Sequence, residues 1–310
     1  MNPILKRTLS GLTVGLFVVG LFLYCPLRAL LPIVAVLAAL AQLEFYQMAK
    51  AKYEPIAWFG ILMGIAWMSV TGLLGFGIGL PLSACGLCLS FPVAAFLLCL
   101  LVTFSSRYRN PVGTIASTLT GFLYVPFLMS FFLLIAQIGA PEFNAKTPWV
   151  SRTGLYTLFA LIAVTKFSDT GGFAFGMAFG KHKMCPAISP KKSWEGLVGS
   201  MIFSAIIAAI MLSVARHFNW GADIRIWNVL SYPTAMAGGA LLALVGTAGD
   251  LIESRFKREF DIKDSATFMP AGQGGFLDMF DSVLFIPALA YPVILAFNRC
   301  RRWAARILMR

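Results

Sequence analysis

Charged side chains are scarce in this sequence. Asp, Glu, Lys and Arg make up 12% of the 310 residues, whereas about 25% is typical of soluble domains. The stretch from Pro55 to Ser106 carries no charge at all, and it is too long for one membrane crossing but long enough for two. A soluble globular domain is therefore excluded, and the 59% hydrophobic composition predicts an integral membrane protein.

Residues suited to thiolate or imidazole metal sites, or to nucleophilic catalysis, are also few. The two histidines, His182 and His217, are too widely separated for a His-rich metal site. Cys85 and Cys88 have the spacing of zinc ligands, but their apolar surroundings offer neither a histidine nor a second cysteine pair, so we interpret them as packing residues. No Ser-His-Asp grouping or cysteine nucleophile is recognisable, and phosphoryl transfer needs neither.

The net charge of +12 comes largely from basic residues in short connections between apolar runs. In a soluble protein such a charge would favour nucleic acid as a partner. Here it is better explained by membrane orientation and by attraction to anionic lipids. We therefore expect the lipid bilayer, and no nucleic acid, as a partner.

Apolar runs predict about nine transmembrane helices and hence an all-α integral membrane protein, a polytopic helical bundle. The predicted crossings are Thr8–Tyr24, Ala29–Leu43, Ile56–Thr71, Ala84–Phe104, Thr114–Ala136, Gly154–Thr165, Leu197–Ala215, Val229–Gly249 and Ser282–Phe297. The first is interpreted as a retained helix because no small-residue cleavage site follows it. We expect one integrated membrane domain, in which residues 1–150 supply the N-terminal helices and residues 151–310 supply the C-terminal helices and the polar motifs.

The basic residues also predict the orientation of the bundle. With the N-terminus in the cytoplasm, most of them fall on the cytoplasmic side, as the positive-inside rule requires. Two polar segments, Lys166–Glu195 and Leu251–Asp281, are expected as loops on that side of a multi-pass protein of the cell (inner) membrane. Alternatively, the run near Gly154 continues as a helix past Lys166 and Asp169, with these polar residues facing the protein interior. The side on which the arginine-rich C-terminal tail lies is left open.

The first polar segment ends in SPKKSWEG, residues 189–196, directly before an apolar run. Ser193 is in position to cap the following helix, whose N-terminus would attract anions. Lys191 and Lys192 beside that N-terminus suit the phosphates of a nucleoside triphosphate. The same two lysines could equally serve as anchors of membrane orientation, and their spacing alone does not separate the two roles.

The second polar segment has carboxylates at both ends. Asp250 and Glu253 are three residues apart, so they share a face if this part is helical, and Asp278 and Asp281 have the same spacing as the last apolar run begins. Carboxylates from two helix ends, brought together, would form an oxygen-rich site for Mg²⁺. Alternatively, Asp278 and Asp281 merely cap a helix and pair with nearby basic residues.

Basic residues and a glycine-rich turn lie between these carboxylates. The chain reads Ser254-x-x-Lys257-Arg258-x₄-Lys263-Asp264, followed by Pro270, Gly274-Gly275 and Asp278-x-x-Asp281. This pattern resembles the signature of the CDP-diacylglycerol synthases, also called phosphatidate cytidylyltransferases. The SPKKSWEG segment resembles a second segment shared by that family, and Asp169 with Gly171 resembles a third. The resemblance covers roughly the C-terminal half of the chain.

The resemblance implies a function and a set of site residues. The function would be transfer of a cytidylyl group from CTP to phosphatidate in a cytoplasm-facing polar cavity, which gives CDP-diacylglycerol and pyrophosphate. Mg²⁺ would lie on Asp250 and Asp278, often with a monovalent cation such as K⁺ beside it, and a homodimer is left open. The residues expected to act in catalysis are Asp250, Asp278, Lys263, Asp264 and Asp281, and those expected to hold the nucleotide are Ser189, Lys191, Lys192, Ser254, Lys257, Arg258, Gly274 and Gly275.

Two positions depart from the pattern of that family. Its glycine turn normally contains a histidine where this chain has Gln273, preceded by the additional residue Ala271, and it has an arginine where this chain has Met279. Glutamine cannot take up a proton near neutral pH, and methionine removes a phosphate-binding charge. These departures keep open a divergent paralogue that uses another lipid phosphate or nucleotide. A separate alternative is a transporter or binding protein whose charged cluster holds a phosphorylated solute, although the charges lie at loop edges on one side and not near the membrane midplane.

Overall fold

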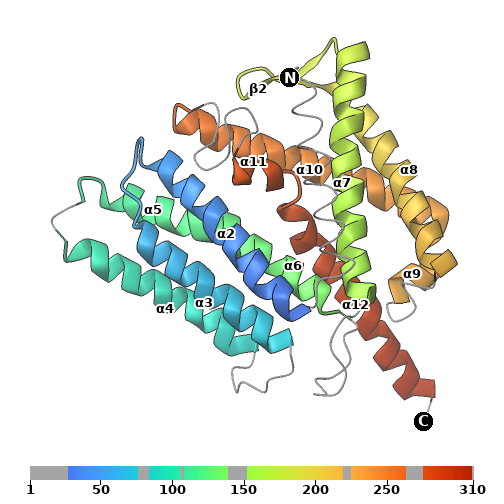
Figure 1. The fold of residues 1–310 in the computed structure, drawn as a ribbon, viewed down its shortest axis with the longest axis horizontal. Coiled ribbons are helices and arrows are strands. Elements are labelled where there is room, and N and C mark those ends of the chain that lie inside the picture. The colour runs from blue at the N-terminus through green and yellow to red at the C-terminus, as the bar shows by residue number, and fades with distance from the viewer. Residues whose placement is uncertain are drawn as a thin grey trace.

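The computed structural model describes residues 27–75, 84–105, 108–138, 152–218, 225–262 and 275–308, which form a helical bundle with one short β-hairpin (Figure 1). The helices are α2 (Leu27–Ala49), α3 (Ala57–Gly75), α4 (Ala84–Thr103), α5 (Pro111–Phe122), a π-helical turn η1 (Leu123–Phe127), α6 (Leu128–Ala136), α7 (Arg152–Phe179), α8 (Trp194–Phe218), α9 (Arg225–Val229), α10 (Tyr232–Glu259), α11 (Phe276–Phe280) and α12 (Phe285–Leu308). The antiparallel hairpin consists of β1 (Lys183–Cys185) and β2 (Ser189–Ser193).

Within these described ranges, six helical segments are long and apolar enough to cross a membrane. They are Leu30–Ala49, Pro111–Ala136, Thr153–Phe179, Trp194–Phe218, Tyr232–Glu259 and Phe276–Phe297, and Ala57–Gly72 and Val93–Thr103 are shorter apolar helices. The chain is an all-α, multi-pass membrane protein, as its apolar runs predict. Eight of the predicted crossings coincide with these helices. The remaining one, Thr8–Tyr24, lies outside the described residues, so the total of about nine stays a prediction.

Local sequence signals set several helix starts. Pro111 occupies the first turn of α5, and the side chain of Asn110 accepts a hydrogen bond from Gly113 N at 2.9 Å. Ser193 Oγ accepts a hydrogen bond from Gly196 N at 3.2 Å, which confirms the predicted cap of α8. This cap fixes the point where the hairpin passes into the apolar helix.

Glycines let α7 and α8 pack closely side by side. A Cβ atom at Gly171 would lie 2.7 Å from the Cβ of Phe203, and one at Gly199 would lie 2.4 Å from the Cβ of Phe175. Larger side chains at either glycine would therefore push the two helices apart. Figure 1 shows the hairpin joining the adjacent ends of these helices.

Both polar segments begin as helices and not as the loops that the sequence predicts, and residues 263–274 of the second lie outside the described residues. α7 continues as a helix to Phe179, which agrees with the alternative prediction for Lys166 and Asp169, and the hairpin follows it. α10 continues to Glu259, so Asp250 lies inside this helix and not at its end. Lys166 and Asp169 of α7 and Asp250 of α10 face a cavity inside the protein where the two apolar runs stop.

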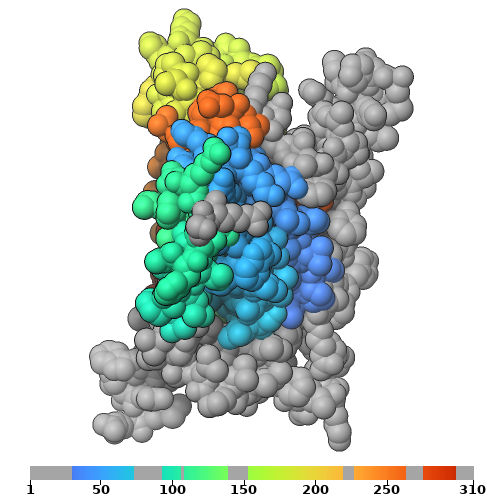
Figure 2. Space-filling view, turned by 90° about the vertical axis from the view of Figure 1, so that its left-hand side faces the viewer, coloured from blue at the N-terminus to red at the C-terminus, as the bar shows by residue number. Residues whose placement is uncertain are grey.

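The polar connections gather at one end of the molecule. Arg258 Nε, near the end of α10, donates a hydrogen bond to Ile188 O in the hairpin at 3.3 Å. Lys52 Nζ, in the α2–α3 connection, lies 2.6 Å from Glu259 Oε1. Figure 2 shows the hairpin and the end of α10 stacked at this end, above α2 and α5. The two segments predicted to share one side of the membrane therefore do lie together.

Candidate active site

A polar cavity of about 360 Å³ lies between α7, the hairpin, α8, α10 and the α11–α12 turn. Lysines and aspartates from several of these elements face it, together with a few apolar side chains. Its lining residues are Lys166, Asp169, Gly172, Phe173, Met184, Lys191, Lys192, Ser193, Gly196, Leu197, Ser200, Thr247, Asp250, Asp278 and Asp281. A cavity with charges of both signs suits a ligand that carries phosphate and a cation.

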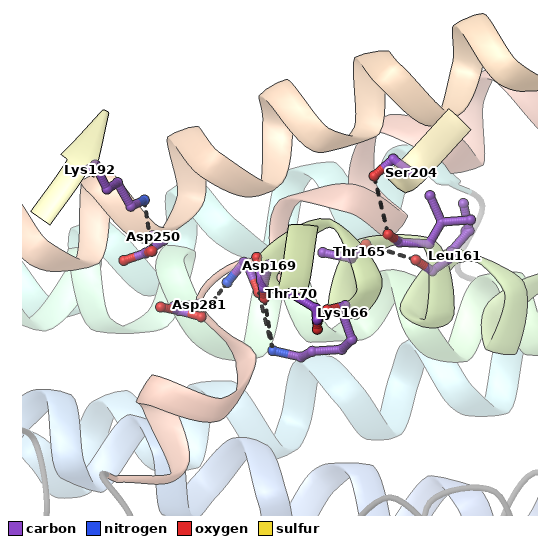
Figure 3. Close-up of polar contacts among 11 residues, drawn as sticks. Leu161, Thr165, Lys166, Asp169, Thr170, Lys192, Ser204, Asp250 and Asp281 are labelled. Atoms are coloured by element: carbon purple, nitrogen blue, oxygen red, sulfur yellow. Dashed lines mark hydrogen bonds and ion pairs between the residues drawn. The ribbon is translucent and has the colours of Figure 1, made fainter. Parts of the chain in front are cut away.

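The side chain of Asp250 on α10 forms an ion pair with a lysine of the hairpin. Lys192 Nζ lies 2.7 Å from Asp250 Oδ2 (Figure 3). It also donates a hydrogen bond to Thr247 O at 3.1 Å. Ser254 Oγ, one helical turn further along, donates to Asp250 Oδ1 at 3.4 Å. The side chain of Lys192 is 20% exposed and turned into the cavity, which favours a ligand-binding role over that of an outward-facing membrane anchor.

Asp278 both caps α11 and pairs with a lysine. Its Oδ2 accepts a hydrogen bond from Gly275 N at 3.1 Å, and its Oδ1 lies 2.6 Å from Lys257 Nζ. The same ammonium lies 3.0 Å from Oε1 of Glu253, which is buried. The capping and pairing that the sequence offers as an alternative to a ligand role are thus present, and Asp278 nevertheless lines the cavity.

Asp281 faces the cavity from the turn after α11. Its Oδ1 accepts a hydrogen bond from Ser282 N, and Figure 3 shows its carboxylate directed toward that of Asp250. Gly249 on α10 makes this approach possible, because a Cβ atom there would lie only 2.6 Å from the carbonyl oxygen of Asp281. The sequence therefore needs a residue without a side chain immediately before Asp250.

Lys166 and Asp169 on α7 complete the wall of the cavity. Lys166 Nζ lies 3.6 Å from Asp169 Oδ2 (Figure 3). It also donates a hydrogen bond to Ser282 Oγ at 3.2 Å. Ser282 Oγ in turn donates to Asp169 Oδ2 at 2.9 Å. Lys166 and Ser282 are absent from the predicted site, although a charged residue next to an apolar run is itself a signal of function.

The predicted site residues fall into four groups. Lys191, Lys192, Asp250, Asp278 and Asp281 meet at the cavity. Ser254, Lys257 and Gly275 contact two of these aspartates from behind, whereas Ser189 and Arg258 lie in or against the hairpin and do not line the cavity. Lys263, Asp264 and Gly274, like Gln273, lie outside the described residues. The catalytic roles of all of them stay predictions.

The carboxylates at the cavity could hold Mg²⁺ only together with further ligands from a substrate or from water. Among the described residues, no group of three or more His, Cys, Asp or Glu side chains is arranged to hold a metal ion. Mg²⁺ is, however, commonly held by one or two carboxylates together with substrate phosphates and water. Asp250 and Asp278 both face the cavity, and each attracts a cation already, since a lysine ammonium lies within 2.7 Å of each.

Comparison with known proteins places the chain in a family. The model of the cytidylyltransferase family matches residues 5–297, nearly the whole chain. The chain belongs to the cytidylyltransferase family. The resemblance inferred from the motifs is thereby confirmed, and the match extends into the N-terminal helices, where the sequence shows no recognisable motif.

Several relatives in this family are named phosphatidate cytidylyltransferase. Those of Staphylococcus saprophyticus subsp. saprophyticus and Staphylococcus haemolyticus are 43% and 41% identical to the chain over 131 residues. The one of Staphylococcus epidermidis is 41% identical over 132 residues. Each alignment takes in 42% of this chain and 45% of the relative, so the chain spans less than half the length of the relatives it matches.

Proposed function

We propose that the protein transfers a cytidylyl group from CTP to phosphatidate. An oxygen of the phosphatidate phosphate attacks the α-phosphorus of CTP, the bond to the β-phosphate oxygen breaks, and pyrophosphate leaves. The observation that carries this proposal is the cavity, where lysines of α7 and the hairpin face aspartates of α10 and the α11–α12 turn. The names of the relatives support CTP and phosphatidate as the substrates.

Positioning and charge neutralisation account for the chemistry. Lys191 and Lys192 would hold the triphosphate, and the charge of Lys192 is coupled to Asp250 through their 2.7 Å contact. The lipid phosphate is already a competent nucleophile, so no strong general base is required. Asp250 and Asp278 would hold Mg²⁺, which when bound neutralises charge on the leaving pyrophosphate.

Apolar side chains at the cavity suit a lipid acceptor. Phe173 lines the cavity and is 65% exposed on α7, and Leu197 lines it from α8. An acceptor with its acyl chains in the bilayer would therefore pass apolar residues while its phosphate meets the lysines. A water-soluble acceptor would need no such apolar wall.

Turnover tests this function directly. The purified full-length protein is incubated in detergent with labelled CTP, Mg²⁺ and phosphatidate, and with diacylglycerol in place of phosphatidate as the control. We expect pyrophosphate release and CDP-diacylglycerol formation only with phosphatidate. A transporter of phosphorylated solutes would release no pyrophosphate, and a divergent paralogue would release it only with a different lipid phosphate or nucleotide.

We further propose that the cavity opens to the cytoplasm of a cell whose inner membrane holds the protein. Basic residues support this orientation, since Lys50, Lys52, Lys181 and Lys183 lie in the connections at the cavity end. In a cysteine-free background, Ser189→Cys should resist an impermeant thiol reagent on intact cells and react after permeabilisation. Labelling on intact cells would reverse the orientation.

A further inference from the structure

Glu44 is a buried carboxylate on an apolar helix far from the signature segments. It lies on α2, within the crossing Leu30–Ala49, and its exposed fraction is 0%. A carboxylate in such a helix is costly to bury and is retained where it has a specific partner or role. Its partner lies in the candidate active site.

The carboxylate of Glu44 holds the beginning of α11. Its Oε2 accepts a hydrogen bond from Leu277 N at 2.9 Å, between residues separated by 233 positions in the sequence. The first N–H groups of a helix have no partner within the helix, so they need outside acceptors. Asp278 serves Gly275 N in the same way. Two carboxylates, one from α2 and one from the candidate site, thus fix the same short helix.

We propose that Glu44 is a positioning residue that keeps α11 oriented so that Asp278 faces the cavity. α11 has only five residues, too few to be stable without tertiary contacts. Without Glu44, the N–H of the buried Leu277 would lack this acceptor, and α11 would have to shift to find another. Asp278 and Asp281 would move with it. The inference rests on the proposed function in so far as Asp278 acts in cytidylyl transfer.

Kinetics of matched variants test the positioning role. Glu44→Leu removes the acceptor, and we expect kcat to fall about tenfold to a hundredfold, with a higher Mg²⁺ requirement, as for other supporting partners of metal ligands. Glu44→Gln keeps an oxygen that can accept from Leu277 N, so most activity should return. If the leucine variant does not fold, Glu44→Asp, which withdraws the carboxylate by one methylene, should also raise the Mg²⁺ requirement.

Gln42→Leu is the matched control on the same helix. Gln42 is equally buried, and its Nε2 donates hydrogen bonds to Gly60 O and to Tyr46 Oη, each at 2.9 Å. Its loss should lower the thermal stability and leave the Mg²⁺ requirement unchanged. If Glu44→Leu behaves in this same way, Glu44 has only a structural role and the proposal is wrong.

Hydrogen exchange separates this proposal from the proposed function. Exchange of the peptide that spans Gly275–Asp281 needs no turnover, and it should be faster in Glu44→Leu but not in Glu44→Gln. If the exchange differs in this way but the unaltered protein makes no CDP-diacylglycerol, the proposed function is wrong and the role of Glu44 in positioning α11 is retained. The proposal for Glu44 would be wrong if this peptide exchanged at the same rate in Glu44→Leu as in the unaltered protein. It would also be wrong if the exchange were equally fast in Glu44→Leu and Glu44→Gln.

Discussion

The polar side chains of the N-terminal helices α2–α6 differ in charge and in partners from those of the C-terminal elements α7–α12. In the N-terminal half, uncharged groups bond to one another: Gln42 Nε2 donates to Gly60 O, and Tyr46 Oη donates to Thr118 O at 2.8 Å. In the C-terminal half, lysines and aspartates oppose one another around a cavity. Uncharged pairs satisfy each other and fix the packing, whereas charges around a cavity stay available to a ligand. This difference supports the proposal that the chemistry takes place in the C-terminal half.

Contacts at the cavity end nevertheless join the two halves. Glu44 accepts the hydrogen bond from Leu277 N, and Lys52 lies 2.6 Å from Glu259 at the end of α10. The N-terminal helices therefore do more than anchor the protein in the bilayer. Variants that break the charged arrangement should affect activity first, and variants that disturb packing should affect stability first.

The largest effect is expected for the two aspartates. Asp250→Asn and Asp278→Asn keep the shape but remove a ligand charge, and each should lower the rate by more than about a hundredfold, the upper range for partners that only support metal ligands. Lipid-dependent pyrophosphate release, Mg²⁺ titration and thermal unfolding check this. Asp261→Asn is the control, because Asp261 is exposed and its positive φ of 56° is tolerated by asparagine. A variant with the normal rate and Mg²⁺ dependence would remove that aspartate from the site.

A smaller loss is expected when one lysine of the cavity is neutralised. Lys192→Gln should lower kcat/KM for CTP about tenfold to a hundredfold, which corresponds to the loss of a hydrogen bond to a charged group. Lys183→Gln is the matched control, since Lys183 is exposed on β1 and does not line the cavity. Steady-state kinetics at several CTP concentrations distinguish the two. Equal and slight effects would mean that both lysines serve only as membrane anchors.

The fold could be predicted largely from hydrophobicity, because long apolar runs have few alternatives to crossing the membrane. The extent of α10 could not, and that of α7 could be predicted only as one of two alternatives, since the apolar pattern stops at Asp250 and at Lys166 while both helices continue. The apolar pattern of a sequence identifies only the positions that face lipid or the protein core. A polar stretch that faces an internal cavity therefore looks like a loop in the sequence.

The residues that meet at the candidate site could be predicted where they belong to recognisable sequence segments, although their roles stay predictions. Lys192, Asp250 and Asp278 belong to recognisable segments. Lys166 and Glu44 are absent from the predicted set, and two of their contacts, with Ser282 and Leu277, join residues 116 and 233 positions apart. Neither pairing leaves a pattern in the sequence beyond a charged residue in or beside an apolar run, which gives the position of a polar group but not its partner.

Packing at Gly249 tests how closely the turn after α11 must approach α10. Gly249→Ala would place a Cβ atom 2.6 Å from Asp281 O, and such overpacking costs about 1–3 kcal/mol of stability. The displaced Asp281 should also lower activity several-fold. Gly238→Ala on the same helix has no heavy atom within 4 Å of the new Cβ, so it should be neutral or stabilising. Thermal unfolding compares the two, and equal stability would show that the turn can move away freely.

The smallest effect concerns the two departures from the family pattern. Met279 follows Asp278 directly on α11, and Gln273 lies outside the described residues. Met279→Arg adds a charge next to Asp278 and should lower the KM for CTP a few-fold. A free histidine titrates near pH 6.5, roughly its ordinary pKa, whereas glutamine does not ionise. Gln273→His should therefore add a step near that pH to the rate profile, and the unaltered protein should show none from this position.

The double variant Gln273→His/Met279→Arg separates three readings of these departures. In a working cytidylyltransferase the unaltered chain already makes CDP-diacylglycerol, and the double variant changes its rate only slightly, because the lysines and aspartates at the cavity are in place without either substitution. In a chain that has lost activity, the double variant would raise turnover from a very low level. In a paralogue with another acceptor, it would shift preference toward phosphatidate. We expect the first result, and undetectable CDP-diacylglycerol formation by the unaltered chain, with tight binding of another phosphorylated ligand, would contradict it.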